Sequence, residues 1–181
     1  ISPDGRLLAY VRADDVWIFD LDRGLDVALT EGGSGQHNPI WSPDGTHIVY
    51  RSGDDIMVRP VDRSTVLEPV ISTDQPDNPI EWLADGTLIV STEGARSGDL
   101  FALNIDDDEP ARPLLDANWQ ERGASLSPDG RWLAYSSDRT KTRQLDVRSW
   151  PDLEGEILVS EGEANVTSQS YPQWSADGAT L

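Results

Sequence analysis

A four-residue turn sequence, Ser-Pro-Asp-Gly or a close variant of it, occurs five times along this 181-residue chain. The copies lie at residues 2–5, 42–45, 83–86, 127–130 and 175–178. The third copy reads Leu-Ala-Asp-Gly and the fifth Ser-Ala-Asp-Gly. Taken from aspartate to aspartate, the copies are 40, 41, 44 and 48 residues apart. Self-similarity at such a period indicates a repeat protein whose units are each one small supersecondary structure.

Other positions also match when the turns are superposed. Apolar residues stand three positions before each aspartate, at Ile1, Trp41, Trp82, Leu126 and Trp174. After each turn, apolar residues alternate with others, which indicates a strand with one buried face. Segments 16–19, 56–58, 100–103 and 145–147 predict a third strand in each unit, and weaker segments such as 27–30 and 156–160 a fourth. The period and the four strands predict an all-β fold, a β-propeller made of four-stranded antiparallel blades.

The recurring tetrapeptide suits a tight turn between the first two strands of a unit. Proline fixes φ at the first corner, aspartate accepts backbone hydrogen bonds, and glycine adopts the positive φ that closes the hairpin. We therefore interpret ten residues as structural turn residues rather than as ligands or catalytic acids: Asp4, Gly5, Asp44, Gly45, Asp85, Gly86, Asp129, Gly130, Asp177 and Gly178.

The chain resembles a known family of repeat proteins. Residues 39–45 read Pro-Ile-Trp-Ser-Pro-Asp-Gly, residues 15–21 read Asp-Val-Trp-Ile-Phe-Asp-Leu, and Leu-Thr follows at 29–30. This pattern is similar to the TolB-like, WD-repeat-like β-propellers over essentially the whole chain. Segments 127–137 and 145–152 are similar to propellers that lie C-terminal to bacterial serine/threonine kinase or regulator domains. The same turns occur in the non-catalytic propeller of prolyl-oligopeptidase-like hydrolases, so the repeat indicates architecture better than it indicates the parent protein.

The resemblance implies that this chain is part of a larger propeller, because propellers of this family usually form a closed ring of six to eight blades. We expect about four blades here, in one partial propeller domain with units at about 1–40, 41–81, 82–125 and 126–173 and a fifth starting at 174–181. Both ends fall inside a repeat, so we expect the missing blades of the same chain to be neighbours of this segment. The total number of blades stays open.

Composition excludes several classes of function. The chain has 33 acidic and 14 basic residues and a net charge of −19, whereas nucleic-acid binding needs a basic footprint. No apolar run approaches the roughly 18 residues that a membrane helix needs. There is no cysteine, which excludes disulfides and thiolate sites.

Catalytic and metal-binding patterns are absent from the sequence. There is no Gly-x-Ser-x-Gly elbow, no phosphate-binding glycine loop followed by lysine, and no His-Glu-x-x-His. The acidic run at 106–109 lacks the glycine and the alternating spacing of a calcium loop. We therefore expect no catalytic residues, no cofactor and no metal in this segment, although the full-length parent could be a kinase or a hydrolase.

A candidate binding surface follows from blade geometry. The loops at the end of each blade opposite the Ser-Pro-Asp-Gly turns are longer and more varied, and loops on a rigid scaffold carry function. We expect His37 to lie in such a loop, and expect a protein partner or small ligand on this surface. For Trp119 and Tyr171, packing against the adjacent blade is the structural alternative. The candidate residues are His37, Asn38, Asn78, Trp119, Arg122, Arg143 and Tyr171.

Three hypotheses for function stay open. The leading one is a non-catalytic binding or scaffold module, the sensor part of a larger bacterial envelope or signalling protein, located in the periplasm or otherwise outside the cytoplasm. The second is the gating propeller of a prolyl-oligopeptidase-like serine hydrolase, and the third is a TolB-like periplasmic scaffold. A cytoplasmic location also stays open.

Overall fold

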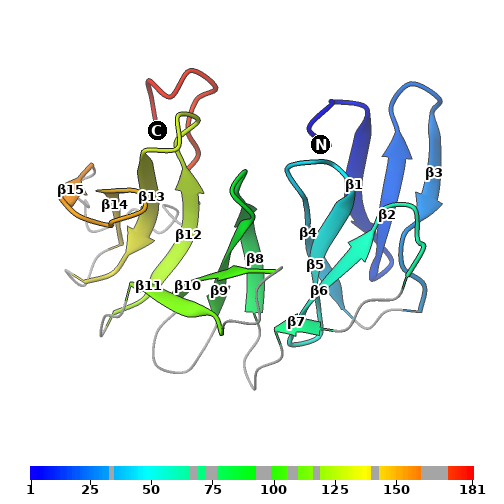
Figure 1. Ribbon diagram of the computed structural model, residues 1–181, viewed down its shortest axis with the longest axis horizontal. Coiled ribbons are helices and arrows are strands. Elements are labelled where there is room, and N and C mark those ends of the chain that lie inside the picture. The colour runs from blue at the N-terminus through cyan, green and yellow to red at the C-terminus, as the bar shows by residue number, and fades with distance from the viewer. Residues whose placement is uncertain are drawn as a thin grey trace. The chain divides into compact units, whose positions relative to one another are not determined.

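The computed structural model describes residues 1–32, 35–65, 69–71, 77–92, 99–105, 110–115, 119–139, 143–159 and 171–181. Its regular elements are all strands, as the sequence predicts (Figure 1). They are β1 (Leu7–Arg12), β2 (Asp15–Asp20), β3 (Leu25–Ala28), β4 (Gln36–Trp41), β5 (His47–Ser52), β6 (Asp55–Pro60), β7 (Pro69–Ile71), β8 (Asp77–Trp82), β9 (Thr87–Thr92), β10 (Leu100–Asn104), β11 (Arg112–Leu115), β12 (Glu121–Leu126), β13 (Trp132–Ser137), β14 (Gln144–Ser149) and β15 (Ile157–Leu158). None of the described residues belongs to a helix long and apolar enough to cross a membrane.

The strands form four separate sheets in which neighbours in sequence are neighbours in space. The first sheet has the order β1-β2-β3, and the others have the orders β4-β5-β6-β7, β8-β9-β10-β11 and β12-β13-β14-β15. Such meanders of antiparallel strands are the blades that the repeat predicts. In the last three sheets the strand before the turn is present, whereas the described strands of the first sheet begin after its turn at Leu7.

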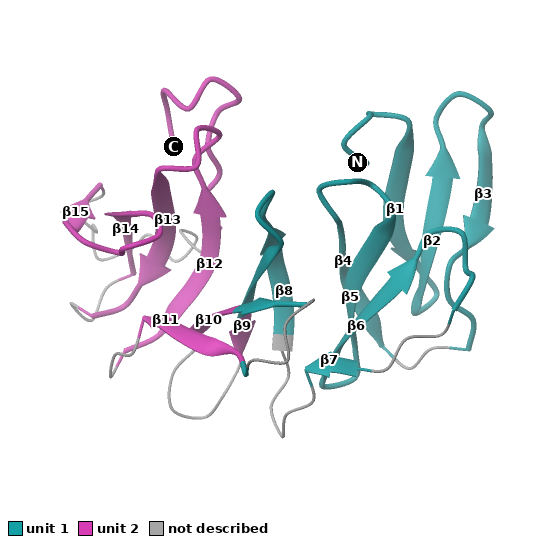
Figure 2. Ribbon diagram, viewed as in Figure 1, with its two compact units in different colours: residues 1–90, 103–110 teal, residues 91–102, 111–181 magenta. Residues whose placement is uncertain are grey.

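Residue contacts divide the chain into two compact units (Figure 2). Unit 1 contains residues 1–90 and 103–110, and unit 2 contains residues 91–102 and 111–181. The first two sheets lie wholly in unit 1 and the fourth lies wholly in unit 2, while the strands of the third are shared.

The turns have the same internal hydrogen bonds in successive sheets. In the second sheet the Ser42 hydroxyl donates to Asp44 Oδ1 at 2.6 Å, and the backbone N–H of Thr46 donates to the same oxygen at 3.0 Å. Equivalent serine-to-aspartate bonds occur in the first, fourth and fifth turns, at 2.6, 2.6 and 2.7 Å. The third turn has Leu83 in place of serine, and Asp85 there still accepts from the backbone of Thr87 at 2.9 Å.

The aspartates of the four turns that contain a serine are held in their ionised form. The hydroxyl of Ser42, then the backbone and hydroxyl of Thr46, lower the pKa of Asp44 from its ordinary 3.8 to about 2. Serine hydroxyls similarly lower the pKa values of Asp4, Asp129 and Asp177. Hydrogen bonds to the charged form stabilise it, so a carboxylate is part of the turn at neutral pH.

An apolar core joins the first two sheets. Val16, Leu29, Trp41, Ile48 and Tyr50 form one buried cluster, and Trp41 is only 8% exposed. These residues come from the alternating positions of β2, β4 and β5, and one from the end of the first sheet. Ile48 and Tyr50 are buried as the alternation predicts, but Val49 between them is buried as well, so the expectation of a single buried face is wrong for β5.

Candidate partner-binding surface

The first strand of the second sheet runs further than its sequence suggests. His37 and Asn38 belong to β4, so the expectation that His37 lies in a loop is wrong. Gln36 pairs with Ser52 and His37 with Arg51, which continues the ladder to the end of β5 opposite the turn. A β-bulge follows His37, and Asn38 has a φ of 53°, a conformation that asparagine tolerates better than most residues. Both side chains remain exposed.

Asn38, Arg51 and Asn78 form a hydrogen-bonded cluster, which we call the Asn38–Asn78 group. Asn38 Nδ2 donates to Asn78 Oδ1 at 2.9 Å, and Arg51 Nη1 donates to the same oxygen at 3.4 Å. Arg51 Nε also donates to the carbonyl of Gly53 at 2.6 Å. The three side chains come from β4, β5 and β8, so the group ties the ends of strands from two sheets within unit 1.

The group retains free hydrogen-bonding capacity. Asn78 Oδ1 receives both bonds, and within the described part of the chain no bond involves Asn78 Nδ2, so its two N–H bonds remain as donors there. Asn38 keeps its carbonyl oxygen as an acceptor, and the Arg51 guanidinium keeps further donors and a positive charge. Donors beside an acceptor match the amide groups of a peptide, and the guanidinium matches a carboxylate.

Sequence reasoning missed Arg51, although the sequence holds a signal for it. Arg51 is not among the candidate residues, and it is the register partner of His37. Extending the alternation of residues 47–50 by two positions would have kept it in the strand and placed it beside the candidate residues.

The remaining candidates lie in unit 2 and are more dispersed. Trp119 is 37% exposed and Tyr171 is 79% exposed, so neither is a core residue. Arg122 lies in β12 opposite Ser136, and Arg143 immediately precedes β14. The structure thus brings together Asn38 and Asn78 from the candidate set, and this pair is the basis of the site. His37 precedes Asn38 in β4 and pairs with Arg51 in the ladder.

A second polar feature, in the fourth sheet, was not expected from the sequence. Asp146 is fully buried and accepts from Arg139 Nη2 at 3.3 Å. Glu156 contacts both Arg139, at 2.5 Å, and Arg148, at 3.4 Å, and Arg148 Nε donates to the Tyr135 hydroxyl at 2.9 Å. We call these five residues the fourth-sheet network.

Burial and charge act in opposite directions on the acids of the fourth-sheet network. Burial raises the pKa of Asp146 and outweighs the opposing effect of Arg139. Burial also acts to raise the pKa of Glu156, but Arg139 and Arg148 outweigh it, and the net shift is downward. The network is thus a structural ion cluster in which burial of the charged Asp146 is energetically unfavourable.

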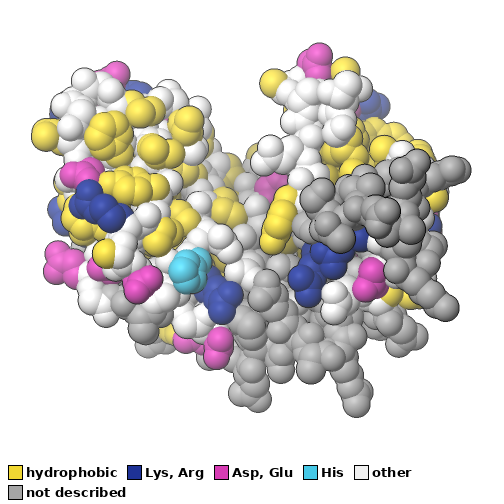
Figure 3. All heavy atoms as spheres, turned by 180° about the vertical axis from the view of Figure 1, so that it is seen from behind, with side chains coloured by type: hydrophobic (Ala, Val, Ile, Leu, Met, Phe, Trp, Pro, Cys, Tyr) yellow, Lys and Arg dark blue, Asp and Glu magenta, His cyan; other side chains and the backbone are white. Residues whose placement is uncertain are grey.

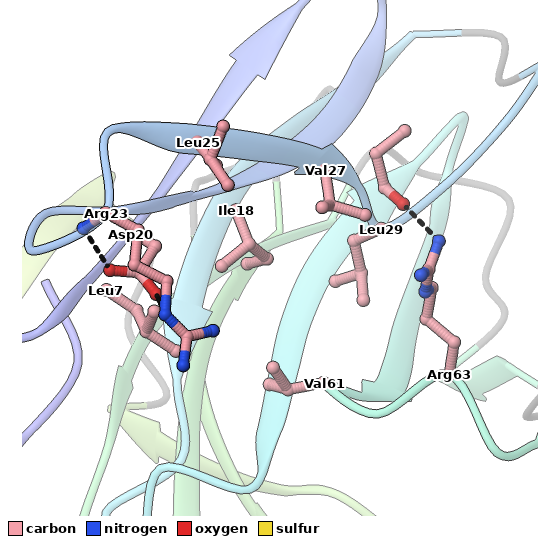
Figure 4. A pocket seen from close by; sticks show the side chains of 10 residues that line it. Leu7, Ile18, Asp20, Arg23, Leu25, Val27, Leu29, Val61 and Arg63 are labelled. Atoms are coloured by element: carbon pink, nitrogen blue, oxygen red, sulfur yellow. Dashed lines mark hydrogen bonds and ion pairs between the residues drawn. The ribbon is translucent and has the colours of Figure 1, made fainter.

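Apolar surface is concentrated on the first sheet. Val11, Leu21, Leu25 and Val27 are between 36% and 64% exposed, and hydrophobic side chains gather over this sheet at the left of Figure 3. A pocket of about 280 Å³ lies beside β3. Figure 4 shows Leu25, Val27 and Leu29 on one side of it and Val61 on the other. Arg63 Nη1 closes one end by donating to the carbonyl of Ala28 at 3.3 Å.

Within the described residues, no group of three or more histidines or acids could hold a metal ion.

Comparison with known proteins places the fold. No protein-family model matches the sequence, and no curated protein matches it. Among solved structures, putative TolB from Agrobacterium tumefaciens superposes with a TM-score of 0.76 at 19% identity, over 89% of this chain. The Swd1 β-propeller domain from Myceliophteria thermophila superposes with a TM-score of 0.70 at 13% identity, over 98% of this chain. The chain has the fold of a TolB-like, WD-repeat-like β-propeller.

The four sheets are therefore propeller blades, and the chain corresponds to part of each related structure. It spans 60% of the Agrobacterium chain and 58% of the Swd1 domain. A puromycin-hydrolyzing peptidase of Mycobacterium tuberculosis also superposes, with a TM-score of 0.69 at 17% identity. There the match covers 89% of this propeller segment and 30% of the peptidase chain.

Proposed function

We propose that this chain is a non-catalytic propeller module that binds a partner protein at the Asn38–Asn78 group. The observation that carries the proposal is the bond from Asn38 to Asn78 across two blades, with Arg51 on the same oxygen. The bond fixes the two asparagine side chains, which carry the acceptor and donors that remain unused among the described residues.

The blades supply the rigidity that recognition requires. β4 and β5 are joined by a ladder from Gln36–Ser52 to Trp41–Ile48, and the buried cluster around Trp41 and Ile48 anchors both strands. Side chains held by a rigid scaffold lose little conformational entropy on binding. The Asn38–Asn78 group is therefore preorganised for a peptide segment.

Charge selects the kind of partner. The chain has a net charge of −19, so its overall electrostatic field repels acidic partners. A positive side chain at a binding surface attracts acidic groups locally, in opposition to that field. Arg51 is half-buried, which strengthens its interaction with a carboxylate compared with a fully exposed arginine. We propose a partner that presents an extended segment with at least one acidic residue.

The wider role is that of a sensor or scaffold part of a larger bacterial envelope or signalling protein, outside the cytoplasm. The likeness to putative TolB and the resemblance of segments 127–137 and 145–152 to kinase-linked propellers support this role. Further blades of the same chain would be the other neighbours of this segment. Trp119, Arg122, Arg143 and Tyr171 stay candidates for additional partner contacts in unit 2.

A second function is favoured by the likeness to the puromycin-hydrolyzing peptidase. In this alternative the chain is the gating propeller of a prolyl-oligopeptidase-like serine hydrolase. The coding sequence that flanks this segment distinguishes the two. A Gly-x-Ser-x-Gly elbow followed by aspartate and histidine would select the hydrolase, and a kinase or regulator domain would select the signalling role.

Photo-crosslinking from the intact parent protein in cells tests the binding surface. A benzophenone amino acid replaces His37 at the proposed surface or, as a matched control, the exposed Arg6 at the turn end of the first sheet. We expect a discrete adduct with one other protein from position 37 alone, and its loss in the Asn78→Ala background. Equal adducts from both positions, or an adduct that survives Asn78→Ala, would contradict the proposal.

A further inference from the structure

A pocket of about 580 Å³ lies at the turn end of the second and third sheets, within unit 1. It is at the opposite end of β5 from the Asn38–Asn78 group, because His47 begins that strand and Ser52 ends it. Its apolar walls are Pro43, Val58, Trp82, Ala84 and Ile105. Pockets for small ligands have volumes of about 300–1,000 Å³ and are mostly apolar with a few polar groups.

The pocket coincides with the one turn whose sequence departs most from the repeat. Between the first two turns, a side chain at Gly45 would lie 3.4 Å from Pro3, so those turns pack closely. At the third turn, the nearest atoms to the equivalent position of Gly86 belong to the amide of Asn104 instead. The third turn also has alanine at the proline position. Here Trp82 is half-buried, whereas the equivalent Trp41 is buried in the core.

The polar groups of the pocket are connected by hydrogen bonds whose directions can be deduced. Asp44 is ionised and accepts only, so the Thr46 hydroxyl donates its single hydrogen to Asp44 Oδ1 at 2.7 Å. The Thr46 oxygen is 2.7 Å from His47 Nδ1 and must accept there, so Nδ1 carries the proton. In the neutral imidazole, Nε2 is then an acceptor.

The side-chain capacity left over at Asp44 and His47 is therefore accepting, and Trp82 adds an aromatic face and an indole N–H donor. The Ser42 hydroxyl is used in both directions, since it donates to Asp44 and accepts from the backbone of His47 at 2.9 Å. Asp44 Oδ2 and His47 Nε2 have no hydrogen-bond partner among the described residues. A carboxylate oxygen, an imidazole acceptor and an indole together favour a positively charged donor, and disfavour anions.

We propose that this pocket binds a small organic cation, a primary ammonium group carried on an apolar or aromatic body. The ammonium group donates to Asp44 Oδ2 and His47 Nε2, and the body packs against Trp82, Val58 and Ile105. This site is separate from the partner surface, because its residues lie at the other end of the second sheet.

Ligand-observed NMR on the intact protein tests the proposal with three probes of one shape: benzylamine, benzyl alcohol and benzoate. We expect benzylamine to bind at least tenfold more tightly than benzyl alcohol, and benzoate not to bind. Asp44→Asn should reduce benzylamine affinity to that of the alcohol. Asp129→Asn, the same change in the matching turn of the fourth sheet, should leave it unchanged.

Two results would overturn the proposal. Similar affinity for benzylamine and benzyl alcohol would show that charge is not recognised. Equal weakening by Asp44→Asn and Asp129→Asn would show that the general negative field attracts the amine. Trp82→Leu keeps the wall apolar and leaves the turn intact, so it gives an independent measurement, and a loss of several-fold for benzylamine is expected there.

Discussion

The second and fourth sheets place different chemistry at the same position. Met57 in β6 is opposite the buried Tyr50, and Asp146 in β14 is opposite the buried Tyr135. Met57 packs against the apolar cluster of the first two sheets, whereas Asp146 binds Arg139 within the fourth-sheet network. One strand pattern thus accommodates an apolar core or an ion cluster.

The difference teaches what each sheet depends on. Apolar burial in the second sheet is non-directional and scales with area. The fourth-sheet network needs particular geometry, because desolvation of Asp146 is offset only while Arg139 stays within reach. Substitutions should therefore affect the second sheet through lost volume and the fourth through broken pairs.

The largest effect is expected from removing the centre of the apolar core. Trp41→Ala should lower the free energy of unfolding by about 3–5 kcal/mol, because it leaves a large cavity beside Val16 and Ile48. Urea denaturation followed by circular dichroism measures the change. Trp174→Ala is the comparison in unit 2, and should cost less because Trp174 is half-buried and its Nε1 donates to the Ser125 carbonyl. Equal midpoints for wild type and Trp41→Ala would mean that this tryptophan does not support the core.

Exchanging the fourth-sheet residue for its second-sheet counterpart should have an intermediate effect. Asp146→Met should cost about 1–3 kcal/mol at pH 7, because Arg139 loses one of its two acceptors in a partly buried place. Burial raises the pKa of Asp146, so its charged form is penalised more in the folded state than in the unfolded chain. The folded state then binds the proton more tightly, so this penalty declines as pH falls from the raised folded-state pKa toward 3.8 and is absent below 3.8.

A double-mutant cycle tests the pairing itself. Arg139→Met should cost less in the Asp146→Met background than in the wild type, since only the pair with Glu156 is then lost. Strictly additive losses in the two single variants and the double variant would show that Arg139 and Asp146 do not interact.

A smaller effect is expected at a turn glycine of the fourth sheet. Gly130 has a φ of 69°, and a side chain there would meet no atom within 4 Å. Gly130→Val should therefore cost about 1–2 kcal/mol from backbone conformation alone. Gly130→Asn is the control, and should cost less because asparagine tolerates this region. A valine variant as stable as wild type would mean that the turn has another conformation in solution.

Much of the fold could be predicted from the sequence because its signals are local and repeated. The tetrapeptide determines the turn through its own hydrogen bonds, and the apolar residues at 48–50 mark a buried strand. The extent of β4 could not be predicted, because the bulge at Asn38 interrupts the alternation that defines a strand. Arg51 and Asn78 are 27 residues apart, and only the packing of two sheets brings them together.

The fourth-sheet network shows a different reason for a missed feature. The segment 145–147 aligns with 16–18 and 56–58, so Asp146 stands where Trp17 and Met57 stand. Taken from the sequence by itself, a polar residue at this aligned position indicates an exposed side chain. Its partners Arg139 and Glu156 lie outside the aligned strands, so the sequence pattern gave no sign of the compensation that permits its burial.

The smallest effect is expected at the turn of the second sheet, where the sign of the pH dependence is opposite to that of Asp146. Hydrogen bonds from Ser42 and Thr46 lower the pKa of Asp44 to about 2, so its contribution is present above the ordinary value of 3.8 and is lost as pH falls from there toward 2. Asp44 is exposed, and after discounting for solvent screening we expect Asp44→Asn to cost only about 0.5 kcal/mol at pH 6. Urea midpoints of wild type and variant should therefore converge between pH 4 and pH 2. If the gap between them stays constant over that range, the carboxylate does not stabilise the turn through its charge. Asp44 and Asp146 would then differ in their burial and not in the sign of their pH dependence.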